Sequence, residues 1–254
     1  MKNQFVADVN DYFKYGLLRA LSNCEDLRPI GIWWMLTDDD AGAHGGKLDY
    51  LEDQERYGTC DKDLYKALCR IAKKKKRRVF EIEKNKLING AQYWPSNVSK
   101  VRIAAKASHE KLSDPYSRAL DFKEMLGQFK NCPLIFADPD NGIEIKSASK
   151  ERHIRWNELV ALFNAGKSLV VYQHKARGRS LDDDVPVLLE RIRELLGANA
   201  SGIVCGRGKT KAEIAFLLIP QLAATEDFCK GARRFVEQFG EFSRQIPPDE
   251  AACE

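Results

Sequence analysis

The stretch Leu134-Ile-Phe-Ala-Asp138-Pro139-Asp140-Asn141-Gly142 decides the expected fold. Its first four residues form an apolar run of strand length, which leads directly into two carboxylates, a proline, an asparagine and a glycine. In an open α/β sheet, ligands bind just beyond the carboxyl ends of the strands. The pattern therefore predicts a buried strand that presents Asp138 and Asp140 to a functional site. Because Asp, Asn, Pro and Gly are also common turn residues, a simple turn is the alternative.

A second apolar run, residues 168–172, is followed by Gln173-His174-Lys175-Ala176-Arg177. We expect it to form another strand, whose end brings the imidazole of His174 to the same edge of the sheet. Histidine titrates near neutral pH and is suited to proton transfer. Two polar strand ends in one sheet favour a functional site over two unrelated turns.

Length and composition limit the class of protein. The chain has 254 residues, enough for one large α/β domain with a substantial core. Its hydrophobic content of 44% and charged content of 31% are ordinary for a soluble protein. No apolar stretch approaches the roughly 18 residues of a membrane span, and the first residues lack the apolar core of a signal peptide. The seven cysteines form no Cys-x-x-Cys pair, so we expect reduced thiols in the cytoplasm.

Apolar periodicity alternates along the chain between the patterns of helices and strands. The alternation predicts an α/β fold with a three-layer, Rossmann-like, mostly parallel sheet and an antiparallel hairpin at one edge. We expect one α/β domain over residues 1–245, with an irregular insertion around 84–115, and a flexible tail over 246–254. The predicted helices are residues 11–21, 64–72, 116–129, 156–163, 185–196 and 225–239, and the predicted strands are residues 30–36, 79–82, 134–137, 169–172, 203–205 and 214–219.

The positive charge of the chain is concentrated in two places, although the net charge is only +4. An unbroken basic block follows the helix predicted over residues 64–72, and a looser basic cluster lies near residue 207. Each could contact the phosphates of a nucleic acid, and the first could instead complement the dipole of a helix end. The block consists of Lys73, Lys74, Lys75, Lys76, Arg77 and Arg78, and the cluster of Arg207, Lys209 and Lys211.

Four short motifs occur in an order that resembles one known family. They are Asp8-Val-Asn-Asp11-Tyr-Phe-Lys14-Tyr15, Thr37-Asp-Asp-Asp40-Ala-Gly-Ala-His44-Gly45, Asp138-Pro-Asp-Asn141 and Val171-Tyr-Gln-His174. In the same order, they are similar to Asn-x-x-Asp-x-x-Lys-His, Asp-Thr-His-Ala-Gly-Ala-Gly, Asp-Pro-Pro-Tyr and Trp-Tyr-Pro. These are motifs of the large-subunit ribosomal RNA adenine-N6 methyltransferases, and together they cover about a tenth of the chain.

The resemblance implies a Rossmann-like fold that binds S-adenosylmethionine (SAM) and methylates an exocyclic amine of a nucleic-acid base. It places the catalytic site at Asp138, Pro139, Asp140 and Asn141, and His174 ends the neighbouring motif. It places the cofactor-binding residues at Asp11, Lys14, Asp38, Asp40, Gly42, His44 and Gly45.

Two departures from the family motifs bear on this chemistry. Asp140 and Asn141 replace the second proline and the aromatic residue, so the motif lacks the ring on which a flipped base would stack. His44 occupies the position before Gly45, which removes the close Gly-x-Gly spacing. Glycine allows the closest approach of backbone to a cofactor, so this change affects the predicted SAM site directly.

The same acids and imidazoles support two alternative functions. Carboxylate and imidazole ligands suit Mg²⁺ or Mn²⁺, and a two-metal site would hydrolyse a nucleic-acid phosphodiester. A non-catalytic module that binds nucleic acid through its basic residues is the third possibility. The candidate metal ligands are Asp38, Asp39, Asp40, His44, Asp138, Asp140, Glu144 and His174.

Overall fold

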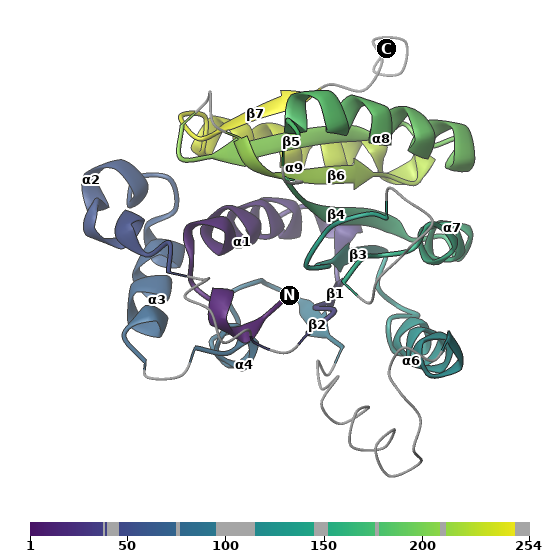
Figure 1. The fold of residues 1–254 in the computed structure, drawn as a ribbon, viewed down its shortest axis with the longest axis horizontal. Coiled ribbons are helices and arrows are strands. Elements are labelled where there is room, and N and C mark those ends of the chain that lie inside the picture. The colour runs from purple at the N-terminus through teal and green to yellow at the C-terminus, as the bar shows by residue number, and fades with distance from the viewer. Residues whose placement is uncertain are drawn as a thin grey trace.

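The computed structural model describes residues 1–37, 39, 46–74, 77–94, 115–144, 152–175, 178–208 and 212–246. In this part of the chain a seven-stranded sheet lies between two layers of helices (Figure 1). The expected α/β fold with a three-layer, Rossmann-like, mostly parallel sheet is confirmed. None of the described helices is both long and apolar enough to cross a membrane.

The sheet has the strand order β2-β1-β3-β4-β6-β5-β7. The first four strands are parallel, whereas β6 is antiparallel to both β4 and β5, and β7 is antiparallel to β5. The predicted antiparallel hairpin is therefore present, with β6 placed inside the sheet and β7 at its edge. The strands are β1 (Ile30–Trp33), β2 (Ala91–Tyr93), β3 (Leu134–Ala137), β4 (Ser168–His174), β5 (Ser201–Gly206), β6 (Ala212–Ile219) and β7 (Ser243–Ile246).

The helices divide between the two faces of the sheet, each of which carries its own hydrophobic core. One core includes α1 (Val9–Ser22), α3 (Lys62–Ala72), α4 (Val79–Lys84) and α9 (Thr225–Gln238). The opposite core includes α6 (Pro115–Gln128), α7 (Trp156–Asn164) and α8 (Leu181–Leu196). The remaining short elements are η1 (Asn3–Phe5), η2 (Glu25–Leu27), η3 (Asp49–Glu52), α2 (Gln54–Tyr57) and η4 (Leu222–Ala224).

Strand β3 shows why the apolar runs form the centre of the sheet. Successive side chains of a strand point to opposite faces. Leu134 and Phe136 accordingly join the core around α1, while Ile135 and Ala137 join the core around α7 and α8. Because both faces are covered, the sequence of β3 is a continuous apolar run, and its polar residues begin only where the strand ends.

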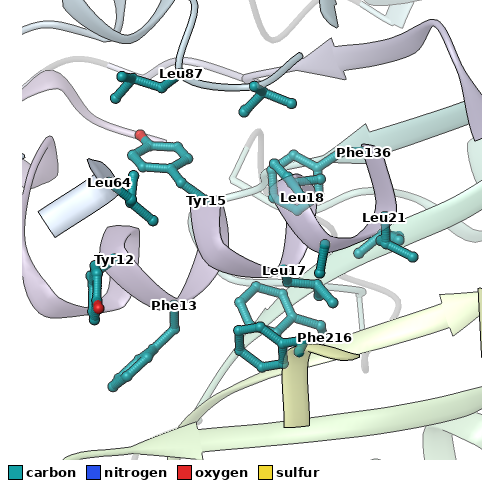
Figure 2. Close-up of a cluster of buried hydrophobic side chains, with 14 of the residues drawn as sticks. Tyr12, Phe13, Tyr15, Leu17, Leu18, Leu21, Leu64, Leu87, Phe136 and Phe216 are labelled. Carbon is teal, nitrogen blue, oxygen red and sulfur yellow. The ribbon is translucent and has the colours of Figure 1, made fainter. Parts of the chain in front are cut away.

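Helix α1 lies in the middle of its layer, and 13 of its 14 residues are buried. Its apolar residues pack against α3, α9 and the strands beneath, and Figure 2 shows Leu64 of α3 beside Tyr12 and Phe216 of β6 beside Leu17. Tyr12 lies 5.2 Å and Phe13 lies 6.3 Å from the ring centroid of Phe239, at the end of α9. A helix enclosed in this way has its orientation fixed by packing. The polar residues of α1 are therefore held in defined positions.

One predicted element is wrong. Residues 79–82 were expected to form a strand, but they belong to helix α4. The segment Val-Phe-Glu-Ile contains apolar residues that fit either period, and the structure buries Val79 and Ile82 while Phe80 is 58% exposed. Burial at a spacing of three residues is typical of a helix face.

Two strands have no counterpart among the predicted elements. Strand β2 falls inside the segment 84–115 that was expected to be irregular, and β7 includes residue 246, where the flexible tail was expected to begin. Each lies at one edge of the sheet and therefore pairs with another strand on one side only. Their sequences, Ala-Gln-Tyr and Ser-Arg-Gln-Ile, accordingly lack the apolar run that marks the central strands.

Candidate functional site

One cavity lies at the point in the sheet where the strands that follow β1 in the chain are added on opposite sides of it. Strand β1 has β2 on one side and β3 on the other, which is the arrangement that opens a crevice at the carboxyl edge of an α/β sheet. A cavity of about 550 Å³ occupies this position. It is lined by Met1, Lys2, Phe5, Asp8, Asn10, Asp11, Lys14, Gly46, Lys47, Asp138, Pro139, Asp140, Asn141, Arg152, Tyr172 and His174.

The first turn of α1 forms one wall of the cavity. Asp8 caps the helix, since its side chain accepts a hydrogen bond from the backbone N–H of Asp11 at 3.0 Å. Residues three and four apart share a helix face, so Asn10, Asp11 and Lys14 all reach the cavity. The motif that resembles a methyltransferase opening thus becomes the polar side of a helix that is otherwise apolar.

Lys14 joins this wall to the end of β3. Its Nζ donates to Asp11 Oδ1 at 2.7 Å and to Asp138 Oδ2 at 2.8 Å, and all three side chains are at most 3% exposed. Burial opposes a charge on the amine, but the two carboxylates outweigh it and raise the pKa of Lys14 above its ordinary value. The lysine therefore stays charged. The family resemblance placed Lys14 and Asp138 in one predicted site, and in the structure the two side chains are in contact.

The carboxylate of Asp11 is fully engaged within the protein. Besides Lys14, it accepts hydrogen bonds from the backbone N–H of Ala7 at 3.0 Å and from the hydroxyl of Tyr15 at 2.8 Å. Asp138 also extends the ladder, because its N–H donates to the carbonyl of Trp33 at 3.0 Å. These contacts fix α1, β1 and β3 relative to one another at the site.

The second acid of the strand end has different partners. Asp140 pairs with the amino group of Met1 at 2.7 Å and accepts a hydrogen bond from the hydroxyl of Thr37. Burial opposes ionisation of Asp140, but the ammonium and the Thr37 hydroxyl outweigh it and lower its pKa. Asp140 is therefore an ionised carboxylate whose charge is already compensated.

The loop after β3 is tied to β4 by a close contact. Gly142 has a φ of +80°, and a Cβ added to it would lie 2.1 Å from Gln173 Oε1. The same oxygen accepts a hydrogen bond from the N–H of Ile143 at 2.9 Å. Glycine is needed here for both reasons, since other residues rarely adopt this φ and none would leave room for the glutamine. The loop that carries Asp140 and Asn141 is held in one conformation.

Strand β4 contributes Tyr172 and His174, whose rings are nearly parallel with centroids 6.3 Å apart. Tyr172 is 8% exposed, and Lys14 Nζ lies 5.0 Å from its ring centroid. Two effects lower the pKa of His174. The larger is partial desolvation of the ring by the surrounding protein, and the smaller is the positive charge of the nearby Lys47. His174 is exposed at the rim and is a neutral imidazole at pH 7, so it can accept a proton there.

Seven predicted site residues meet at this cavity: Asp11, Lys14, Asp138, Pro139, Asp140, Asn141 and His174. The other predicted members, Asp38, Asp40, Gly42, His44 and Gly45, lie outside the described residues, although Gly46 lines the cavity. Their predicted roles as catalytic or cofactor-binding groups stay predictions.

Sequence reasoning did not select Asn10 or Tyr172 as members of the site. Asn10 lies beside Asp11 within the family-like motif, but the motif leaves that position unspecified. Tyr172 belongs to an apolar run, which is typical of a strand buried in the hydrophobic core. Successive side chains of β4 point to opposite faces of the sheet, and Tyr172 lies on the face that α1 covers. This alternation was the sequence signal that could have identified Tyr172 as a site residue.

Among the described residues, no group of three or more His, Cys, Asp and Glu side chains is arranged to hold a metal ion. Asp138 and Asp140 each have a cationic partner in the protein. Three of the candidate ligands, Asp38, Asp40 and His44, lie outside the described residues, and the metal site stays a prediction.

The described residues of the basic block lie between the end of α3 and the start of α4, and one of them contacts the turn that precedes α1. Lys73 caps the C-terminus of α3, where positive charge complements the helix dipole, and Lys74 pairs with Glu81. Arg77 donates through Nη1 to the carbonyl of Val6 at 3.1 Å, in the turn that precedes α1. Lys75, Lys76, Lys209 and Lys211 lie outside the described residues, and Arg207 pairs with Asp49 at 2.7 Å.

Comparison with known proteins does not assign a function, because no protein family and no curated protein matches the chain. The function has to be argued from the cavity and its residues.

Replacing Lys14 with methionine should destabilise the protein by about 3–5 kcal/mol, because it leaves two buried carboxylates without their cation. The loss should be smaller at pH 5 than at pH 8, since protonation removes the charge of an unpaired buried acid. Urea unfolding at both pH values measures it. Lys62→Met, at an exposed position of α3, is the control and should change stability by less than about 0.5 kcal/mol. Equal stability of Lys14→Met and wild type would show that the ion pair contributes nothing.

Asp8→Asn should alter how stability depends on pH. Burial, and then the nearby Asp11, raise the pKa of Asp8 from 3.8 to about 7. The folded state therefore holds a proton that the unfolded state releases, and this contribution to stability is lost as the pH rises from about 4 to about 7. Asparagine is an equally good cap but does not titrate.

Relative to wild type, Asp8→Asn should thus gain on the order of 4 kcal/mol between pH 4 and pH 8, because each pKa unit corresponds to about 1.4 kcal/mol. Denaturant unfolding across this range provides the measurement. Asp53→Asn, at the exposed cap of α2, is the matched control and should show a difference from wild type that does not vary with pH. A pH-independent difference for Asp8→Asn as well would contradict the raised pKa.

Proposed function

We propose that the protein binds SAM in the cavity at the carboxyl edge of the sheet and transfers its methyl group to an exocyclic amine of a nucleic-acid base. The observation that carries the proposal is the meeting of two family-like motifs at one cavity, through the contacts of Lys14 with Asp11 and Asp138. These segments are more than a hundred residues apart in the chain, and chemistry in α/β proteins concentrates at this edge.

The residues at the cavity fit such a cofactor. Its volume of about 550 Å³ is in the usual range for pockets that enclose a small ligand. Asp8 and Asn10 offer acceptors to the amino and hydroxyl groups of the ligand, and Phe5 and Tyr172 offer apolar ring surface. When bound, SAM supplies an electrophilic methyl group.

Residues of the chain hold the site in place, border the space for the acceptor amine and accept its proton. Asp138 and Lys14 hold the wall of the site in place, because both are buried and bonded to each other. The loop of Pro139 and Asn141 borders the space where an acceptor amine would enter. His174, neutral at pH 7 and exposed at the rim, takes the proton that the amine releases after methylation.

The nucleic acid in this proposal approaches across the basic block. Lys73, Lys74 and Arg78 are exposed, and the contact of Arg77 with Val6 connects the block to the turn that lines the cavity. Exposed cations attract phosphates irrespective of sequence. A cytoplasmic location also belongs to the proposal, since the six described cysteines are free thiols, which persist in a reducing compartment.

Isothermal titration calorimetry tests the cofactor directly. Wild type should bind SAM in the absence of divalent ions, and Asn141→Trp should weaken binding on the order of tenfold or more, because the indole fills part of the cavity. Asn23→Trp, at the exposed far end of α1, should bind as wild type does. Transfer of tritiated methyl groups from SAM to total RNA or DNA then tests the reaction. Binding of Mg²⁺ or Mn²⁺ with no binding of SAM would instead favour the metal-dependent phosphodiesterase.

Replacing all six residues of the basic block with glutamine should weaken binding to RNA and flatten its salt dependence, since fewer counterions are released. Fluorescence anisotropy at several salt concentrations measures both. The control carries six glutamines at exposed cations of the helical layers: Lys123, Lys130, Arg191, Lys230, Arg233 and Arg234. If the two sextuple variants bind alike, the block serves only as a charged helix end.

A further inference from the structure

Asn10 is the one polar side chain in the first turn of α1 for which the structure shows a buried oxygen without a partner. The residue is 8% exposed, and no described group donates a hydrogen bond to its Oδ1. Its neighbours differ, because the oxygens of Asp11 accept hydrogen bonds from Ala7, Lys14 and Tyr15. A buried polar atom without a partner is costly and is rare in folded proteins.

The position of Asn10 indicates from where a donor could reach its Oδ1. Asn10 lies one helical turn before Lys14, and both line the cavity. The enclosure of α1 by its aromatic neighbours prevents the helix from rotating this side chain elsewhere (Figure 2). The cavity is therefore the side from which a bound ligand can donate a hydrogen bond to Asn10 Oδ1.

The chemistry of the amide defines that ligand further. A carboxamide presents an acceptor oxygen and an N–H donor side by side, and it pairs with a group that presents a donor next to an acceptor. The adenine ring does so through its 6-amino group and the adjacent ring nitrogen, and asparagine is a standard partner for this edge. Phe5 and Tyr172, which line the same cavity, provide apolar surface for a flat ring.

We propose that the Asn10 carboxamide reads the amino edge of an adenine ring bound in this cavity. The inference rests on the proposed function, because it assigns the adenine of an adenosyl ligand to a particular residue of the chain. It goes beyond that function in making Asn10 the residue that determines base specificity. On the edge formed by position 6 and N7, inosine presents two acceptors, its 6-oxygen and N7, so either orientation of the carboxamide sets Asn10 Oδ1 against an acceptor and leaves both without a donor.

Calorimetry with four probes tests the proposal: S-adenosylhomocysteine, S-inosylhomocysteine, adenosine and inosine. Wild type should bind each adenine probe on the order of tenfold or more tightly than its inosine counterpart. Asn10→Ala should bind the members of each pair equally, whereas Asn23→Ala, at the exposed end of the same helix, should discriminate as wild type does. The melting temperature of Asn10→Ala without ligand should not fall, because the amide oxygen has no partner to lose.

The outcomes separate this inference from the proposed function. If wild type binds S-adenosylhomocysteine and S-inosylhomocysteine equally well, the role of Asn10 is overturned and the cofactor proposal stands. The same holds if Asn10→Ala still binds the adenine probes more tightly than their inosine counterparts. Discrimination between adenosine and inosine that depends on Asn10, without binding of S-adenosylhomocysteine, supports the inference and overturns the cofactor proposal. If no adenine probe binds, both are overturned.

Discussion

The buried ion pair between Lys14 and Asp138 is the interaction on which the site depends. It joins the first helix to the end of the central strand β3, across more than a hundred residues of sequence, and Asp11 completes it from within α1. All three groups are removed from water, so each carboxylate is tolerated there because it accepts a hydrogen bond from the charged Lys14. The position of the cavity wall is therefore coupled to the charge state of this cluster.

The packing of α1 explains how one helix can belong to both the core and the site. Its aromatic residues are enclosed between α3, α9 and the sheet, of which Figure 2 shows Leu64, Phe136 and Phe216, while Asn10, Asp11 and Lys14 share the face that borders the cavity. Such enclosure leaves little freedom for rotation of the helix. The side chains of Asn10 and Lys14 are consequently oriented by residues that do not themselves touch the cavity.

The polar groups at the cavity differ in how far the protein satisfies them. Asp11, Asp138, Asp140 and Gln173 have partners within the chain and so serve to hold its segments together. Asn10 has an acceptor without a donor, and His174 presents a neutral imidazole at the rim. A residue whose donors and acceptors all have partners within the protein is a positioning group, whereas a residue with an unpaired donor or acceptor is available to a ligand.

The sequence by itself determined the central strands and the α/β class, because strands covered on both faces must be continuously apolar; β3 was predicted with the bounds that it has in the structure. It also placed Asp138, Lys14 and His174 at one edge of the sheet. It missed the polar edge strands β2 and β7 and assigned residues 79–82 to a strand, since short or partly covered segments carry no distinctive period. Only the tertiary structure decided which acid pairs with which cation and that Asn10 is buried without a partner. Those facts depend on contacts between segments distant in sequence, and local periodicity holds no information about them.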